Sequence, residues 1–174
     1  MYHHYGKKIA FIAHPRTASQ AIGSVLKIRG FELIGGHHQF ESILCLETTF
    51  ATIRNPFDLM VSWYYQEIYK SGQEEPFDKW LRKRLYNPNE YMKLGLFPGQ
   101  GLCTDILHFE NLQEEFDQLM EKVGLSPIKI PQKNVSDKRA GRHFIHYYTP
   151  ELIDLMLGRY SGVIYNNGYT IPEI

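Results

Sequence analysis

The stretch from Lys8 to Arg29, KIAFIAHPRTASQAIGSVLKIR, constrains the fold more than any other part of the chain. Its apolar run IAFIA has the length and the β-branched residues of a buried strand rather than a helix. Pro15 favours an extended conformation at His14 and therefore ends this run. Apolar residues at helical spacing follow, and Thr17 precedes Gln20 at the spacing of a capping box. The sequence therefore predicts a strand, a tight turn and a helix in succession.

The predicted turn carries Arg16, Thr17 and Ser19. The first N–H groups of a helix have no partner within the helix, and its dipole adds positive potential there. A turn of this kind can therefore hold an anion. An ordinary strand–helix corner, in which Thr17 only caps the helix, explains the same residues, and both interpretations stay open on this stretch alone.

Composition and charge exclude several classes of protein. The 174 residues include 43% hydrophobic and 22% charged residues, as in ordinary globular domains. The 19 basic residues balance the 19 acidic ones, so no global field attracts nucleic acid or an anionic membrane. Cys45 and Cys103, in no CxxC pattern, indicate neither a disulfide framework nor a zinc site. With no apolar run of about 20 residues and no signal-peptide core, we expect one domain, residues 1–174, in the cytoplasm.

A second strand–turn–helix unit follows the first. Residues 48–53, TTFATI, are rich in β-forming residues and run directly into Arg54, Asn55 and Pro56. Asn before Pro at the first helical position is a strong helix-start signal, and this helix is expected to stop near Gly72. With a further short strand at 31–34, two such units predict an α/β fold with a parallel sheet and right-handed crossovers.

The second half of the chain predicts further elements of the same kinds. They are helices over 75–85, 111–123 and from Thr149 to about Tyr160, a strand over 104–109, a long surface loop over 86–103, and an irregular basic segment over 127–142.

Basic and hydroxyl side chains are predicted to meet at one edge of the sheet. The turns after neighbouring parallel strands lie side by side at the carboxyl edge, where ligands of open α/β sheets bind. Arg16 comes from the first turn and Arg54 from the end of the strand over 48–53. Ser62 falls in the second turn of the following helix, close enough to share an anion with Arg54, and the basic loop over 138–142 can close over it.

Two histidines, His37 and His38, follow the short strand over 31–34 at the same edge. Guanidinium groups, hydroxyls, a helix N-terminus and a nearby imidazole suit a ligand with separated anionic groups and a proton transfer. Adjacent histidines without a third ligand at a suitable spacing do not indicate a metal site.

The order of these features resembles that of the sulfotransferases that use 3′-phosphoadenosine 5′-phosphosulfate (PAPS). The first loop of that family reads roughly Pro-Lys-Thr-Gly-Thr-Thr, and PRTASQ, residues 15–20, occupies it here. The family's 3′-phosphate motif is Arg, then Asn-Pro, then Ser eight residues after the Arg, and Arg54 through Ser62 match it within FATIRNPFDLMVSWY. GGHHQFESI is similar to the segment in which carbohydrate-type members place a base histidine. ILHFENLQEEFDQLMEKVGL and YTPELIDLM…NNGY also resemble family segments, so the resemblance spans about residues 8–169.

The resemblance implies a sulfotransferase fold, in which a P-loop-like parallel sheet is flanked by helices. It implies transfer of the sulfuryl group from PAPS to a hydroxyl-bearing acceptor, with a carbohydrate as the commonest choice, and with no metal. His37, or His38 in its place, would take the proton of the acceptor hydroxyl, and Arg16 would stabilise the departing phosphate of 3′-phosphoadenosine 5′-phosphate (PAP). The cofactor-binding residues that it implies are Pro15, Arg16, Thr17, Ala18, Ser19, Gln20, Arg54, Ser62 and Arg139.

Three positions of the first loop depart from the family pattern. Arg16 stands where most members have lysine, and because arginine keeps its proton, it acts only by charge and hydrogen bonding. Ala18 replaces a glycine, and Gln20 replaces a hydroxyl residue. A P-loop-type phosphoryl-transfer enzyme is a second interpretation, although GxxxxGK[ST] is absent. A nucleotide-binding module without turnover is a third, and Ala18 and Gln20 are the residues that favour it.

Overall fold

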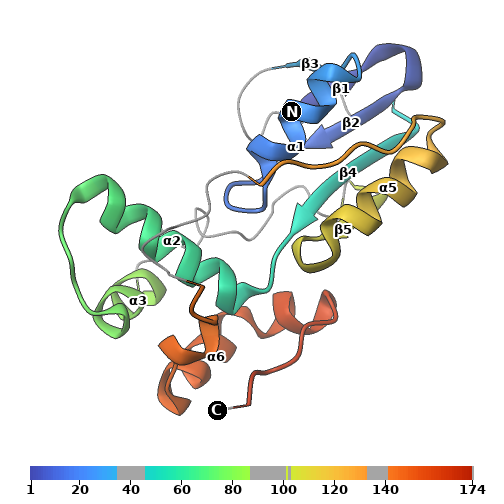
Figure 1. Ribbon diagram of the computed structural model, residues 1–174. Helices are drawn as coiled ribbons and strands as arrows, with labels where there is room; N and C mark the ends of the chain where they lie inside the picture. The colour runs from blue at the N-terminus through green and yellow to red at the C-terminus, as the bar shows by residue number, and fades with distance from the viewer. Residues whose placement is uncertain (35–45, 87–100, 102, 133–140, 174) are drawn as a thin grey trace. The chain divides into compact units, whose positions relative to one another are not determined.

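The computed structural model describes residues 1–34, 46–86, 101, 103–132 and 141–173 (Figure 1). The chain divides into two units. Met1–Arg54 with Phe97–Asn134 forms the first, called here the sheet unit, and Asn55–Leu96 with Val135–Ile174 forms the second, called the helical unit. The prediction of one domain over 1–174 stays a prediction.

A five-stranded sheet with the order β3-β1-β2-β4-β5 forms the centre of the sheet unit. Strands β2, β4 and β5 are parallel, as expected, whereas β1 is antiparallel to both β2 and β3. The α/β class is thus confirmed, but the prediction of a parallel sheet is wrong for this edge. The strands are β1 (Tyr2–His4), β2 (Ile9–Ile12), β3 (Glu32–Leu33), β4 (Thr48–Ile53) and β5 (Asp105–His108).

The antiparallel edge follows from the length of one connection. Only the 3-10 turn η1, Tyr5–Lys7, and the left-handed residue Lys8 join β1 to β2. Parallel neighbours need a crossover of roughly a dozen residues or more, so two strands this close along the chain pair as a hairpin. The polar His3-His4 pair gave no strand signal, and β1 was therefore missed by the sequence analysis.

Helices α1, Ser19–Ile28, and α5, Leu112–Lys122, cover one face of the sheet. Alternate residues of the strands point to this face, because side chains of a strand alternate between its two sides. Phe11 of β2 and Phe50 of β4 stack with ring centroids 4.9 Å apart, and both are fully buried. Full burial of such a side chain contributes about 1.5–3 kcal/mol. The parallel pairing of β2 with β4 and of β4 with β5 places the carboxyl ends of these strands side by side.

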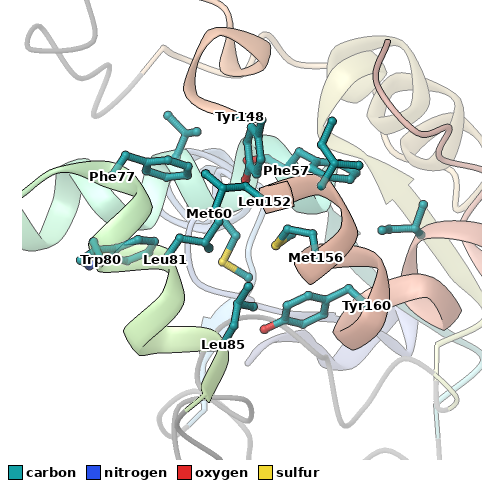
Figure 2. Close-up of a cluster of buried hydrophobic side chains, with 13 residues drawn as sticks. Phe57, Met60, Phe77, Trp80, Leu81, Leu85, Tyr148, Leu152, Met156 and Tyr160 are labelled. Atoms are coloured by element: carbon teal, nitrogen blue, oxygen red, sulfur yellow. The ribbon is translucent and has the colours of Figure 1, made fainter. Parts of the chain in front are cut away.

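Among the described residues of the helical unit, three helices pack around a hydrophobic core (Figure 2). They are α2 (Pro56–Ser71), α3 (Phe77–Tyr86) and α6 (Pro150–Asn166), with the 3-10 helix η6 (Phe144–Tyr147) before α6. Tyr148 is buried among them and donates its hydroxyl hydrogen to the carbonyl oxygen of Phe57 at 2.9 Å. The buried hydroxyl group of Tyr148 therefore has a hydrogen-bond partner within the core.

Local signals predicted the bounds of α2 closely. The Asn55 side chain accepts a hydrogen bond from the Phe57 N–H at 3.0 Å, Pro56 is the first helical residue, and Gly72 ends the helix at φ 67°. The predicted elements over 75–85, 104–109 and 111–123 also appear, as α3, β5 and α5.

The last helix is longer than predicted. It reaches Asn166 instead of ending near Tyr160, because Tyr160 and Ile164 continue its buried face. Most of the predicted loop over 86–103, and residues 133–140 of the basic segment, lie outside the described residues. In the described ranges no helix is long and apolar enough to cross a membrane.

Candidate anion-binding site

The turn between β2 and α1 differs from the capping arrangement that the sequence predicted. Helix α1 begins at Ser19, Ala18 occupies the N-cap position, and no side chain caps the helix. The Thr17 hydroxyl lies 2.9 Å from the carbonyl oxygen of His14 and 2.6 Å from the Thr52 hydroxyl of β4. Because Thr17 is fully buried, its hydroxyl takes the partners that the sheet provides. The prediction of a Thr17 capping box is therefore wrong.

Two residues of this turn have left-handed backbone conformations. Arg16 has φ 65° and Ala18 has φ 62°. A left-handed conformation costs a residue with a Cβ roughly 1–2 kcal/mol, whereas glycine adopts it freely. Ala18 is the position at which the family pattern has glycine, and its φ value gives the physical reason for that preference.

Arg16 and Arg54 lie together at the carboxyl edge of the sheet. Arg54 follows β4 directly, and its Nη1 donates to the carbonyl oxygen of Arg16 at 3.1 Å. Burial, and then the positive charge of Arg54, lower the pKa of Arg16 below its ordinary value. Two like charges close together and partly removed from water are unfavourable, and a bound anion relieves that cost. This edge therefore has the electrostatic character of an anion-binding site.

The aromatic ring of Phe109 supports the Arg54 guanidinium. Phe109 directly follows β5, and the Arg54 Cζ lies 4.1 Å from the centroid of its ring. Strand β5 itself is tied to α5 by Glu115, whose Oε2 accepts from the His108 N–H at 2.5 Å. The imidazole Nδ1 of His108 also lies 3.2 Å from Oε1 of the same carboxylate. Glu115 thus fixes the end of β5, and with it the place of Phe109.

The other expected site residues are placed as follows. Ser19 is buried at the start of α1, and Gln20 is exposed in its first turn. Ser62 is buried in the second turn of α2, within the helical unit, and the anion that it would share with Arg54 stays a prediction. His37, His38 and Arg139 lie outside the described residues. No group of three or more His, Cys, Asp or Glu side chains that could hold a metal ion occurs in the part of the chain that the structure describes.

Sequence reasoning missed two residues that shape this edge, Thr52 and Phe109. Thr52 is 1% exposed in β4, and its hydroxyl donates to the carbonyl oxygen of Thr17 at 2.9 Å. The available signal was a threonine two positions before Arg54, since residues two apart in a strand share a face. Phe109 carried a weaker signal, as the last residue of the predicted strand over 104–109.

Compared with known proteins, the chain matches no family model, no curated protein sequence and no solved structure. The fold defines an α/β protein in which Arg16 and Arg54 lie together at the carboxyl edge of the parallel strands. The likeness to the PAPS-dependent sulfotransferases rests on the residues of the chain itself.

Proposed function

We propose that the protein is a sulfotransferase that moves the sulfuryl group of PAPS to an acceptor hydroxyl. The observation that carries this proposal is the pairing of Arg16 and Arg54, which are 38 positions apart in the sequence, at one sheet edge. PAPS carries a 5′-phosphosulfate and a separate 3′-phosphate, so it offers each guanidinium its own anionic group. Charge-assisted hydrogen bonds of this type contribute about 1.5–3 kcal/mol each.

In the proposed complex the turn after β2 holds the 5′-phosphosulfate. The N–H groups of the first turn of α1 and the Arg16 guanidinium supply donors and positive charge there. Arg54 holds the 3′-phosphate, and Ser62 is the second residue that the family's 3′-phosphate motif assigns to this group. The Phe109 ring keeps the Arg54 guanidinium in place, because a cation over an aromatic face is attracted to it.

The transfer itself needs one proton acceptor and stabilisation of one leaving group. The acceptor oxygen forms a bond to sulfur, and the bond between sulfur and the bridging phosphate oxygen breaks. Its electron pair stays on the phosphate of PAP, and the proton of the acceptor goes to His37 or, one position on, His38. Arg16 stabilises the negative charge that develops on the leaving oxygen. The acceptor is a hydroxyl compound, with a carbohydrate as the leading candidate.

Calorimetric titration with two ligands tests the cofactor assignment. Arg54→Ala should weaken binding of PAP by about 10- to 100-fold more than binding of adenosine 5′-phosphate, which has no 3′-phosphate. Arg159→Ala, which removes an exposed arginine of α6, is the matched control and should change neither affinity. Equal losses for both ligands would contradict the assignment of the 3′-phosphate to Arg54.

Turnover separates this proposal from its two alternatives. Loss of the sulfuryl group from PAPS in the presence of hydroxyl acceptors, with and without Mg²⁺, is the expected activity. Transfer of a phosphoryl group from ATP that requires Mg²⁺ would favour the P-loop-type enzyme instead. Tight PAP binding without any transfer would favour a nucleotide-binding module, which is compatible with the strained Ala18.

A further inference from the structure

Donors from β4 and from Arg54, the residue that follows it, engage the carbonyl groups of the turn after β2. The Thr52 hydroxyl donates to the carbonyl oxygen of Thr17 at 2.9 Å, and Arg54 Nη1 donates to that of Arg16 at 3.1 Å. Within the turn, the Thr17 hydroxyl lies 2.9 Å from the carbonyl oxygen of His14. The carbonyl oxygens of His14, Arg16 and Thr17, which would repel an anion, therefore each have a hydroxyl or guanidinium group within hydrogen-bond distance.

The two threonine hydroxyls form one buried pair. Their oxygens are 2.6 Å apart, and the two residues are 0% and 1% exposed. Two hydroxyls carry two protons, so at any moment two of the three contacts among Thr17, Thr52 and their carbonyl partners are hydrogen bonds. A buried hydroxyl without a partner is unfavourable, and each threonine therefore keeps the other in place.

The direction of these carbonyl groups fixes the direction of the N–H groups. In a trans peptide the C=O and the following N–H point to opposite sides, and the described residues contain no cis peptide bond. When the carbonyls of Arg16 and Thr17 point to Arg54 and Thr52, the N–H groups of Thr17 and Ala18 point away from those two donors. Alternating left-handed residues in such a turn collect N–H groups into a concave anion-binding arrangement.

We propose that Thr17 and Thr52 are positioning residues that preform the anion-binding turn, and that Arg54 completes this clamp. The proposal rests on the proposed function, and it gives Thr17 a different role from the cofactor contact that the family resemblance implies. The clamp holds Arg16 and Ala18 in conformations that neither would keep in an isolated peptide. The ligand then binds to a turn that is already ordered, which raises its affinity.

Substitution of Thr52 by valine tests the clamp, because valine keeps the shape of the side chain and removes the hydroxyl. Thr49→Val is the matched control. Thr49 is also a buried threonine of β4, at the other end of the strand, where it accepts a hydrogen bond from the Thr104 N–H at 3.2 Å. Both variants lose one buried hydroxyl from the same strand, and only one of them loses the contact with the turn.

Thr52→Val should weaken PAP and adenosine 5′-phosphate alike, by about 3- to 10-fold, as expected for one lost hydrogen bond. Thr49→Val should leave both affinities within about twofold of the wild type, and Thr52→Ser should restore most of the loss. Equal affinity losses in Thr52→Val and Thr49→Val would overturn the proposal, as would a Thr52→Ser variant as weak as Thr52→Val.

Two further measurements keep the test independent of folding and of the cofactor assignment. The amide signals of Ala18 and Ser19 in NMR spectra of the free protein should shift in Thr52→Val and Thr17→Val but not in Thr49→Val. Unmoved signals would overturn the proposal.

Inorganic pyrophosphate serves as a probe without a nucleoside. If the wild type binds pyrophosphate but not PAP, the proposed function fails, and the same variant series measured with pyrophosphate still decides the clamp.

Discussion

The guanidinium group of Arg54 lies 4.1 Å from the centroid of the Phe109 ring. The two residues follow β4 and β5, whose last residues Ile53 and His108 are paired in the parallel ladder. Adjacent strand ends therefore bring a cation and an aromatic face together across a sequence separation of 55 positions. The contact leaves Arg54 with a defined orientation at the edge where Arg16 also lies.

Replacement of Phe109 by leucine is predicted to weaken binding of PAP by about 2- to 30-fold, since a cation–π contact at a partly exposed site contributes roughly 0.5–2 kcal/mol. Leucine keeps an apolar side chain against the core of the sheet unit, where Phe109 also packs. Phe109→Tyr keeps the aromatic face and should retain the wild-type affinity. Calorimetry of the three proteins checks the prediction, and a leucine variant with unchanged affinity would refute it.

The left-handed conformation of Ala18 predicts that Ala18→Gly stabilises the protein. The φ value of 62° costs alanine roughly 1–2 kcal/mol, and the greater freedom of glycine in the unfolded chain offsets about 0.5–1 kcal/mol of the gain. The free energy of unfolding should therefore rise by about 0.5–1 kcal/mol in urea titrations.

Ala21→Gly is the control for this substitution, because Ala21 lies in the right-handed part of α1. It should lower the free energy of unfolding by at least about 0.5–1 kcal/mol. If Ala18→Gly destabilises the protein as Ala21→Gly does, the strain attributed to Ala18 is absent in solution.

Local sequence signals predicted the elements that local interactions stabilise. Asn55, Pro56 and Gly72 each act within a few residues, and α2 begins and ends where they lie. Strand β1 depends instead on its pairing with β2, a contact that the polar residues His3 and His4 do not announce. β1 lies between β3 and β2, so its polar residues are held in the sheet by pairing on both sides and not by an apolar pattern of their own.

The site shows the same division between local and distant determinants. The topology of a parallel sheet was enough to predict that Arg16 and Arg54 lie at one edge. The role of Thr17 was not predictable in this way, because the capping-box spacing competes with a partner, Thr52, that is 35 positions away. Which carbonyl groups turn toward β4 is decided by tertiary packing, so neither Thr52 nor the direction of the turn could be read from a motif.

The buried histidine His3 predicts that acid destabilises the protein. His3 is 7% exposed, and no described residue forms a hydrogen bond with its Nε2. Burial lowers the pKa of His3, the neighbouring His4 lowers it further, and the opposite Glu32 partly offsets both. The unfolded chain therefore binds the proton more readily than the folded protein.

The sign of the effect follows from this difference. As the pH falls below the unfolded value of about 6.5, His3 becomes protonated first in the unfolded chain, and the free energy of unfolding decreases until the pH passes the folded pKa. His3→Leu should remove this part of the pH dependence, so the free energy of unfolding of His3→Leu relative to the wild type should be higher at pH 5 than at pH 8. Urea titrations across that range provide the measurement, and parallel curves for the two proteins would show that His3 does not contribute.

Arg16 is predicted to act mainly in the transition state of the proposed transfer. Negative charge on the bridging oxygen grows only as the bond between sulfur and oxygen breaks, and a preorganised cation aimed at that charge raises turnover. Arg16→Ala should lower the single-turnover rate by about 10²- to 10³-fold, with a much smaller loss of PAP affinity. Arg16→Lys should keep much of the rate, because lysine supplies a charge at the same position.

The pH at which the rate falls on the alkaline side should differ between the wild type and Arg16→Lys. Burial and the charge of Arg54 lower the pKa of Arg16, and a lysine at the same position would be subject to both effects from a lower starting value of about 10.4. The lysine therefore loses its proton, and with it the charge that stabilises the leaving phosphate, at a lower pH than arginine does. Single-turnover rates from pH 7 to 10 should fall earlier in Arg16→Lys than in the wild type. An Arg16→Ala protein with a normal chemical step and only weaker PAP binding would remove Arg16 from the transition state.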